Sequence, residues 1–349
     1  MIAAKSYAVD SHTAKFAPHA INRRALRPND VHIAISHCGI CHSDLHTARG
    51  EWQGTTYPCV PGHEIVGKVV AVGPAVKNFK KDDYVGVGCM VDSCQDCQSC
   101  KDGLEQFCEK GFTGTYNGKD RQSGENTLGG YSDQIIVSDK FVLRVPKNLD
   151  PSKAAPLLCA GITLWSPLKH WGAGKGKKVG INGLGGLGHM GVKLAHALGA
   201  KVVLFSRTES KREDALRLGA DDVIISTNNE QMAKHASSFD LIIDTVSAPH
   251  DLNAGIGMLK RDGSYVMVGA SAENHPPMAH FPFIMGRRSF AGSLIGGIKE
   301  TQEMLDFCGE HNISSETEVL PIQKIEEAYE RMEKSDVRYR FVIDMQSIR

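Results

Sequence analysis

Four cysteines lie close together in one segment of the chain. They follow the spacing CxxCxxCx7C, which lets all four thiolates reach one ion without closing a long loop. Zinc prefers a tetrahedral shell, and four thiolates would fill that shell and leave no position for water or substrate. The pattern therefore predicts a structural zinc site at Cys94, Cys97, Cys100 and Cys108. The alternatives are an iron–sulfur cluster, disulfides, or surface cysteines without a role.

A second set of possible metal ligands is spread along the chain. It comprises Cys41 in CGICHSDLH, His63 and Glu64 in VPGHEIVG, and Cys159 in LLCAGIT. Spacing says little about such a set, because a free cysteine is often just a small buried hydrophobe and a histidine can be an ordinary core residue. These residues alone leave open both a catalytic metal and simple packing.

A glycine pattern typical of nucleotide binding occurs in KKVGINGLGGLGHMGVKLAHALGA. It is GxGxxG at Gly183, Gly185 and Gly188, with Gly186 and Leu187 before the last glycine. An apolar strand precedes it and a helical pattern follows, which is the context that a dinucleotide-binding turn requires. The glycines allow a tight turn, close approach to a pyrophosphate, and close helix–strand packing, while the helix N-terminal amides face the phosphates.

The next predicted strand, KVVLF, leads into Ser206, where an NAD-specific enzyme normally has an acidic residue on the ribose 2′-hydroxyl. The sequence here is SRTESKRED, in which Ser206, Arg207 and Lys211 can donate hydrogen bonds and positive charge to a 2′-phosphate. Glu209 lies past the strand end. The segment therefore predicts a preference for NADPH, and the alternative is only a solvated, charged helix start.

Two hydrophobic patterns divide the 349 residues, a length that suggests two domains. Residues 1–152 carry short β-rich runs such as VHIAISHCGI and SDQIIV, typical of an irregular, mostly antiparallel domain. Residues 153–294 alternate strands and helices, which predicts a doubly wound Rossmann domain with a parallel sheet and helices on both faces. Residues 295–349 hold a helical stretch, IEEAYERMEK, and a β-like one, RYRFVIDM, and could rejoin the first domain.

Composition limits the partners of this α/β chain. Forty basic residues balance forty acidic ones, so no global positive field attracts nucleic acid or an anionic membrane. The N-terminal MIAAKSYAVD lacks the apolar stretch of a signal peptide, and no run approaches the roughly 18 to 20 apolar residues of a membrane span. We therefore expect a small-molecule substrate and a cytoplasmic location. The cysteines outside the two ligand sets are assigned to packing: Cys38, Cys59, Cys89 and Cys308.

The motifs also occur together in a recognisable order. CGICHSDLH, PGHEIVGKVVAVG, the four-cysteine array, LLCAGIT and GLGGLG follow one another as in the zinc-containing medium-chain alcohol dehydrogenases. The chain resembles most their cinnamyl-alcohol-dehydrogenase branch, including bacterial broad-range aldehyde reductases, over essentially its whole length. The resemblance implies a GroES-like catalytic domain beside the Rossmann domain, two zinc ions, NADP(H), reduction of a broad range of aldehydes, and a homodimer.

The same resemblance assigns the dispersed residues. Cys41, His63 and Cys159 would hold a catalytic zinc with its fourth position open, and Glu64 would ligate it when substrate is absent. Asp44 matches the family's carboxylate that accepts the imidazole N–H of His63 and fixes its tautomer, although it could simply be a turn or cap residue.

The resemblance also implies a proton path and cofactor contacts. Ser43 would pass a proton through the cofactor ribose to His46, unless both are ordinary polar residues. His42 and Thr163 would contact the pyrophosphate and the nicotinamide side. Trp52, with Leu294 or Ile295, would line a roomy apolar substrate pocket, although core packing explains buried aromatics equally well.

Two rival functions share parts of this pattern. A zinc-free quinone reductase of the same superfamily has the fold without the metal, and a catalytically silent NADPH-binding regulator would keep zinc only for stability. The complete set of Cys41, His63 and Cys159 argues against the first, and the addition of Ser43 and His46 argues against the second.

Overall fold

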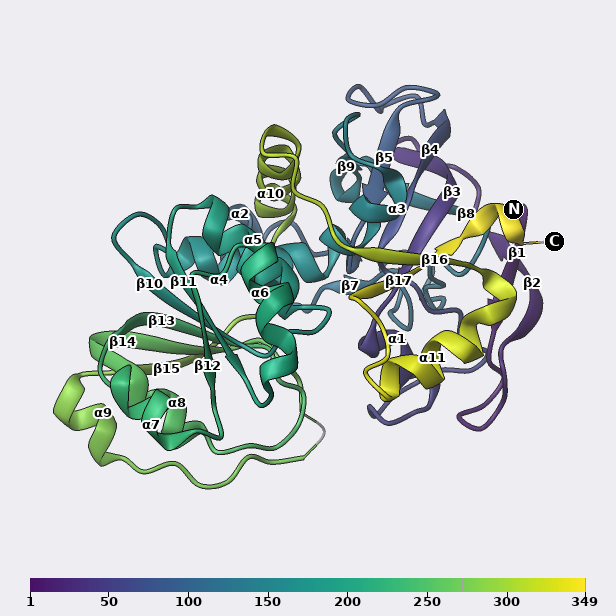
Figure 1. Ribbon diagram of the computed structural model, residues 1–349. Helices are drawn as coiled ribbons and strands as arrows, with labels where there is room; N and C mark the ends of the chain where they lie inside the picture. The colour runs from purple at the N-terminus through teal and green to yellow at the C-terminus, as the bar shows by residue number, and fades with distance from the viewer. Residues whose placement is uncertain (272, 349) are drawn as a thin grey trace. The chain divides into compact units, whose positions relative to one another are not determined.

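The computed structural model describes residues 1–271 and 273–348. It divides into two compact units, one made of residues 1–159 and 296–349 and the other of residues 160–295. Figure 1 shows the strands and helices of both.

A six-stranded parallel sheet forms the centre of the 160–295 unit. Its strands, in spatial order, are β12 (Asp222–Ile225), β11 (Lys201–Ser206), β10 (Lys178–Asn182), β13 (Phe239–Asp244), β14 (Leu259–Met267) and β15 (Ser289–Gly292). Consecutive residues of the central strands, such as Val202, Val203 and Leu204, are completely buried. Burial without alternation means that both faces of the sheet are covered, as the sequence predicts.

Helices cover the two faces of this sheet in separate groups (Figure 1). The helices are α4 (Ala160–His170), α5 (Gly188–Ala197), α6 (Arg212–Leu218), α7 (Asn229–Lys234), α8 (Leu252–Met258) and α9 (Phe281–Gly286). Right-handed crossovers put α5 and α6 on one face, and α7, α8 and α9 on the other. The direction of winding reverses between β10 and β13, and ligands bind at the carboxyl ends of the strands at such a switch point.

A seven-stranded, mainly antiparallel sheet forms the centre of the other unit. Its strands are β16 (Thr317–Pro321), β17 (Arg340–Asp344), β3 (Asp30–Ile40), β4 (Ile65–Val72), β5 (Tyr84–Val87), β9 (Leu143–Arg144) and β8 (Gln134–Ser138), the last pairing with β3. Two smaller sheets pair β1 (Ile2–Ala8) with β2 (Ala17–Arg23), and β6 (Met90–Asp92) with β7 (Thr113–Gly114). This is the irregular β-rich architecture expected for the first segment.

The C-terminal segment belongs to this second sheet. Strand β17 pairs antiparallel with β3, so Val342 lies opposite Gly39 in the register. The helices of this unit are α1 (His42–Ala48), α2 (Gln98–Lys101), α3 (Pro151–Ala154), α10 (Ile298–Glu310) and α11 (Ile325–Glu333). Helix α11 buries one face, with Ile325, Ala328, Tyr329 and Met332 at helical spacing. The pairing resolves what periodicity leaves open, because the tail completes the β-rich unit. Within the described residues, no helix combines the length and the apolar composition needed to cross a bilayer.

Candidate functional site

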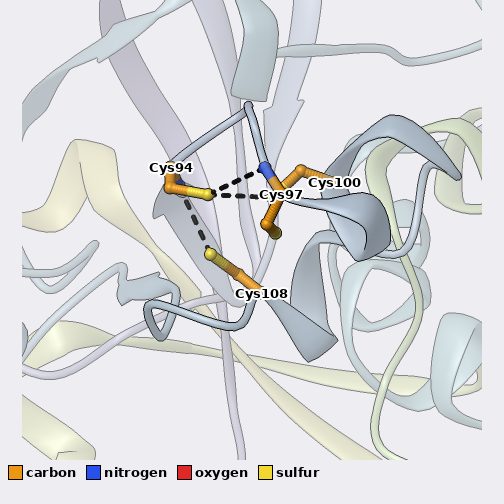
Figure 2. A group of neighbouring side chains, drawn as sticks. All are labelled: Cys94, Cys97, Cys100 and Cys108. Atoms are coloured by element: carbon orange, nitrogen blue, oxygen red, sulfur yellow. Dashed lines mark hydrogen bonds between the residues drawn. The ribbon is translucent and has the colours of Figure 1, made fainter.

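The four-cysteine segment folds back on itself so that its sulfur atoms converge (Figure 2). The four Sγ atoms all lie within 4.8 Å of one another, and Cys94 and Cys100 are 3.9 Å apart. Zinc–sulfur bonds of about 2.3 Å in a tetrahedron would separate the sulfurs by about 3.8 Å. The arrangement therefore fits one tetrahedral zinc ion.

Backbone amides support the negative charge of these sulfurs. The N–H of Cys97 donates to Cys94 Sγ and the N–H of Cys94 donates to Cys108 Sγ, both at 3.4 Å. Backbone hydrogen bonds from Cys100 and Glu109 lower the pKa of Cys97 to about 6. The segment thus favours thiolates, which are the form that binds metal.

The dispersed ligands converge in the same unit. Cys41 follows β3 and begins α1, His63 and Glu64 precede β4, and Cys159 precedes α4. One ligand atom from each lies within 4.8 Å of the others, all four residues are buried, and the sulfurs of Cys41 and Cys159 are 3.9 Å apart. Residues separated by more than a hundred positions are therefore brought together at the spacing that one zinc ion requires.

Asp44 fixes this arrangement from one side. The carboxylate is completely buried and accepts hydrogen bonds from the backbone N–H groups of Cys41, at 2.9 Å, and Gly62, at 3.0 Å. It also lies 3.0 Å from Nδ1 of His63. With Nδ1 donating to Asp44, Nε2 of His63 is left with its lone pair available to a metal. The Tyr131 hydroxyl donates to the same carboxylate at 3.4 Å.

Glu64 forms a buried ion pair with Arg340, a residue of β17. Burial raises the pKa of Glu64 to about 7, although the Arg340 charge opposes that shift. Oε1 of Glu64 contacts the guanidinium, whereas Oε2 accepts no hydrogen bond within the described residues. The carboxylate fits tightly, because a Cβ atom added at Gly39 would lie 1.9 Å from Oε2. A buried oxygen without a hydrogen bond beside two thiols and an imidazole fits a metal ion.

The two residues expected to move a proton, Ser43 and His46, both lie on α1. Ser43 Oγ is 3.7 Å from Cys41 Sγ, at the edge of the ligand group. His46 contacts the Glu51 carboxylate through Nδ1, and its ring stacks on Trp52 with the centroids 5.3 Å apart. The His42 ring is 6.2 Å from that of His46. The Glu51 and Trp52 contacts hold the imidazole in one orientation.

The glycine pattern occupies the turn from β10 to α5, as the sequence predicts. Gly183 has a φ of +94°, and a Cβ atom on Gly188 would lie 1.9 Å from the Gly183 carbonyl oxygen. A Cβ atom on Gly185 would instead point into open space, with nothing within 4 Å. Two glycines therefore allow the turn and its packing, and the third leaves the backbone open, which suits the approach of a pyrophosphate. Gly186 and Leu187 complete the turn.

The segment after β11 lies beside this turn, because the strands are parallel and Asn182 pairs with Phe205 in the register. The Ser206 hydroxyl donates to the Thr208 carbonyl oxygen at 2.8 Å. Arg207 is exposed, and Lys211 ends a short helical turn, Glu209–Lys211. Glu209 forms an ion pair with Arg212, which reduces its repulsion of any nearby anion. Thr163 is a separate case and lies buried within α4.

Three neighbours of the dispersed group are not among the site residues predicted from the sequence. Arg340 is followed by three apolar residues in β17, and a charge beside such a buried run is a signal that could have identified it. The ring of Tyr116 lies 5.7 Å from that of His63. Cys89, assigned to packing, has its thiol against Cys159, and that contact lowers its pKa. No local pattern marks the last two.

Models of two families match the chain. Residues 27–147 match the alcohol dehydrogenase GroES-like domain, and residues 186–310 match the zinc-binding dehydrogenase family. Among curated proteins, the aldehyde reductase YahK of Escherichia coli is 56% identical over 99% of both chains. The NADP-dependent alcohol dehydrogenase C 1 of Mycolicibacterium smegmatis is 53% identical over the full length of both.

Solved structures agree with these matches. A cinnamyl alcohol dehydrogenase from Sorghum bicolor superposes with a TM-score of 0.95 at 43% identity, covering 99% of each chain. A Helicobacter pylori enzyme of the same kind, complexed with NADP(H), gives 0.92 at 44% identity and the same coverage. Together with the converged ligand sets, these findings mean that the protein is an NADP-dependent alcohol dehydrogenase or aldehyde reductase that uses zinc, and that the chain belongs to the medium-chain zinc alcohol dehydrogenases.

Proposed function

We propose that the dispersed group is the catalytic zinc centre and that Cys94, Cys97, Cys100 and Cys108 hold the structural zinc. Cys41, His63 and Cys159 are the constant ligands of the catalytic site. The observation that carries this proposal is the convergence of two buried thiols, 3.9 Å apart, with an imidazole oriented by Asp44. Bound there, zinc supplies a Lewis acid that stabilises negative charge on the aldehyde oxygen during hydride transfer.

Glu64 supplies the exchangeable position in this proposal. Its Oε2 atom, which accepts no hydrogen bond in the described residues, would be the fourth ligand when substrate is absent, and Arg340 would balance the charge of the carboxylate when it is not a ligand. The Glu64 carboxylate would thus have a positive partner both as a ligand and when it is not one. Such a paired charge costs less to bury than a carboxylate without a partner. Glu64 is therefore a conditional ligand.

Ser43 and His46 form the proton path. The Ser43 hydroxyl lies beside the ligand group and donates to the oxygen that gains charge, while His46 exchanges protons with solvent. The contacts of His46 with Glu51 and Trp52 leave Nε2 for the inner end of this path. An imidazole suits that role, because it can both accept and donate a proton through its ring nitrogens.

The cofactor site combines the glycine turn with the end of β11. Gly183, Gly185, Gly186, Leu187 and Gly188 receive the pyrophosphate on the backbone of the turn. The residues that receive the 2′-phosphate and favour NADPH are Ser206, Arg207 and Lys211. His42 and Thr163 are assigned to the pyrophosphate and the nicotinamide side by family resemblance.

The reaction is tested by following NADPH oxidation with a panel of aliphatic and aromatic aldehydes. The proposal predicts turnover with many of them and loss of turnover after chelation. Activity with quinones that survives complete removal of zinc would indicate a quinone reductase, and binding of NADPH without any turnover would indicate a regulator. Steady-state rates in both directions test the further expectation that reduction is faster than oxidation.

Cofactor choice is tested by Ser206→Asp. A carboxylate there repels the 2′-phosphate and can bind a 2′-hydroxyl, so the KM for NADPH should rise sharply and NADH should be used better. Ser206→Ala is the matched control, because it removes the hydroxyl without adding charge and should change the preference much less. A cofactor preference that is the same in Ser206→Asp and in the wild type contradicts the assignment.

We also propose that the protein is a homodimer, formed through the 160–295 unit. Strand β15 is an edge of the parallel sheet, and Phe281, Ile284 and Met285 on nearby α9 are 64%, 68% and 80% exposed. An edge strand can pair with its own copy across a two-fold axis, and adjacent apolar side chains would then be covered. A second copy is the partner that fits both features.

Light scattering tests the dimer. The wild type should have twice the chain mass of 37.9 kDa, and Ile284→Glu should shift the mass toward the monomer. The matched control is Leu216→Glu, which changes an apolar residue of α6 that is also exposed and should leave the mass unchanged. A monomeric wild type would refute the proposal.

The remaining proposals concern location and domain limits. We place the enzyme in the cytoplasm, since none of the ten cysteines, all of which the structure describes, forms a disulfide, and neighbouring thiols would oxidise readily in an oxidising compartment. The functional domains are residues 1–152 with 295–349, and residues 153–294. Labelling the protein in fractionated cells tests the location, and separate expression of residues 153–294 tests whether that domain folds alone.

A further inference from the structure

A buried carboxylate, Asp244, lies at the carboxyl end of β13 beside the carboxyl end of β10. Asn182 is its partner in the register of these two parallel strands, and Gly183 follows Asn182 directly. The winding of the sheet reverses between β10 and β13. Asp244 therefore lies at the base of the glycine turn, at the switch point where sheets of this kind bind nucleotides.

Asp244 joins the ends of three strands. Its Oδ1 atom accepts hydrogen bonds from the Asn182 side-chain amide at 3.0 Å and from the Val246 backbone N–H at 3.1 Å. Its backbone oxygen accepts from the N–H groups of Val268 and Gly269, which follow β14, both at 3.0 Å. One residue thus fixes the ends of β10, β13 and β14 relative to one another.

The other oxygen of Asp244 faces a histidine. His250 Nε2 lies 2.9 Å from Oδ2, which within the described residues accepts no hydrogen bond of standard geometry. Nδ1 of the same ring lies 2.9 Å from the Ala248 carbonyl oxygen. The Asn182 side-chain amide nitrogen is also near Nε2, but at 3.5 Å it lies farther away than Oδ2. The nearest neighbour of each ring nitrogen is thus an oxygen that can accept, which favours protons on both nitrogens. The Asp244 carboxylate beside Nε2 stabilises the protonated, cationic form of His250.

We propose that Asp244 and His250 form a charged clasp that positions segment 245–251 against the glycine turn, and that tight NADPH binding depends on this clasp. Thr245 Oγ1 donates to the Asn182 carbonyl oxygen at 2.7 Å, and a Cβ atom on Gly183 would lie 3.3 Å from a Val246 methyl group. Movement of this segment would therefore disturb the turn. The inference rests on the assignment of the glycine turn to NADPH.

The clasp makes cofactor binding depend on pH. Contact with Asp244 raises the pKa of His250 above its ordinary value of 6.5. Asp251 at the start of α8 also favours the cation, and His275 and Tyr265 are the other titratable groups around the pair. Because the pKa is raised in the folded state, the clasp is complete below pH 6.5 and is lost as the pH rises through the raised pKa. Nε2 of the neutral His250, with the remaining proton on Nδ1, then turns its lone pair toward Oδ2 of Asp244, and no proton lies between these two atoms.

The test is the dissociation constant of NADPH for the zinc-loaded enzyme, measured by NADPH fluorescence from pH 6.5 to pH 9.5. The wild-type constant should rise by about five- to tenfold over this range. His250→Gln should bind NADPH at low pH within about threefold of the wild type and show no rise, since a glutamine amide can donate to Asp244 without titrating. Asp244→Asn should also remove the rise, because its amide can donate to a neutral imidazole.

His235→Gln is the matched control. His235 is another partly buried histidine of the same unit. It contacts Lys178 at the start of β10, whereas Asp244 lies at the carboxyl end of β13, so the variant should keep the wild-type dependence of NADPH binding on pH. A flat wild-type profile, or a rise in His250→Gln that parallels the wild type, overturns the clasp. Absence of NADPH binding at every pH would instead overturn the cofactor site on which the clasp depends. Melting curves confirm that each variant is folded.

Discussion

The two ligand groups of the β-rich unit are built in opposite ways. The four cysteines come from residues 94–108, two of them are buried and two partly exposed, and backbone N–H groups donate to the sulfurs of Cys94 and Cys108. The dispersed group comes from three separated segments, all of its residues are buried, and its Glu64 forms an ion pair with Arg340. The first arrangement depends on local chain geometry, and the second depends on the finished fold.

This difference suits the four-cysteine group to stabilising the fold and the dispersed group to the chemical reaction. A shell of four thiolates has no position to exchange, so its zinc can only hold the segment together. A shell of two thiolates and an imidazole, with a carboxylate that has its own cationic partner, can release one position to substrate. The two sites should therefore respond differently to the same kind of substitution.

Loss of one ligand from the dispersed group should have the largest effect on activity. Cys41→Ser should retain about one zinc per chain and reduce aldehyde turnover by about three orders of magnitude, because several kcal/mol of charge stabilisation is lost. Metal analysis and kcat measure the two effects. Cys308→Ser, which removes another buried thiol, should leave both values unchanged. Turnover by Cys41→Ser within tenfold of the wild type contradicts the role of this site.

Loss of one ligand from the four-cysteine group should instead affect stability. Cys97→Ser should lower the melting temperature by about 10 °C, since structural zinc contributes directly to folding. The kcat of the folded fraction should stay within about threefold of the wild type. Thermal melts and active-site titration with NADPH measure these values. A variant that melts normally but has lost turnover would reverse the assignment of the two sites.

The sequence predicts the local features of the molecule better than the assembled ones. The four-cysteine spacing and the glycine turn are each contained in one segment, and the structure shows both sets of residues converged as expected. The alternation of strands and helices likewise predicts the parallel sheet, which the structure and the family matches confirm.

Cys41 and Cys159 could be paired only through resemblance, because nothing in their spacing brings them together. Arg340 shows the same limit more clearly. It reaches Glu64 only because β17 pairs with β3. The residue pattern within one strand does not predict which distant strand it pairs with. Roles that depend on such pairing become visible once the fold is known.

Removing the support of one ligand should have an intermediate effect. Asp44→Asn keeps the shape of the side chain but weakens its hold on His63 Nδ1, so activity or zinc affinity should fall by about 10- to 100-fold. Competition with a coloured chelator measures the affinity. The dispersed site should be the only one affected, since Asp44 has no contact with the four cysteines among its hydrogen bonds in the described residues. Equal weakening of both sites would contradict this.

The smallest effect on the dispersed site is expected for a residue that contacts Asp44 and not a zinc ligand itself. Tyr131 donates to Asp44 at 3.4 Å and meets the Tyr329 hydroxyl at the same distance. Tyr131→Phe removes one neutral hydrogen bond, worth about 1 kcal/mol, so zinc should leave the dispersed site no more than about tenfold faster. Release kinetics measure this, and Tyr7→Phe, at another buried tyrosine, is the control. Faster release than in Asp44→Asn would contradict the order of these effects.

The most direct test of the difference between the two sites is cobalt substitution followed by visible absorption. Cobalt should be placed separately in each site, using Cys97→Ser to leave only the dispersed site and Cys41→Ser to leave only the four-cysteine site. An aldehyde analogue added with NADPH should change the spectrum of cobalt at the dispersed site and leave the spectrum at the four-cysteine site unchanged. If the analogue does not change the spectrum of cobalt at the dispersed site, this metal offers no position to substrate, and the account is contradicted.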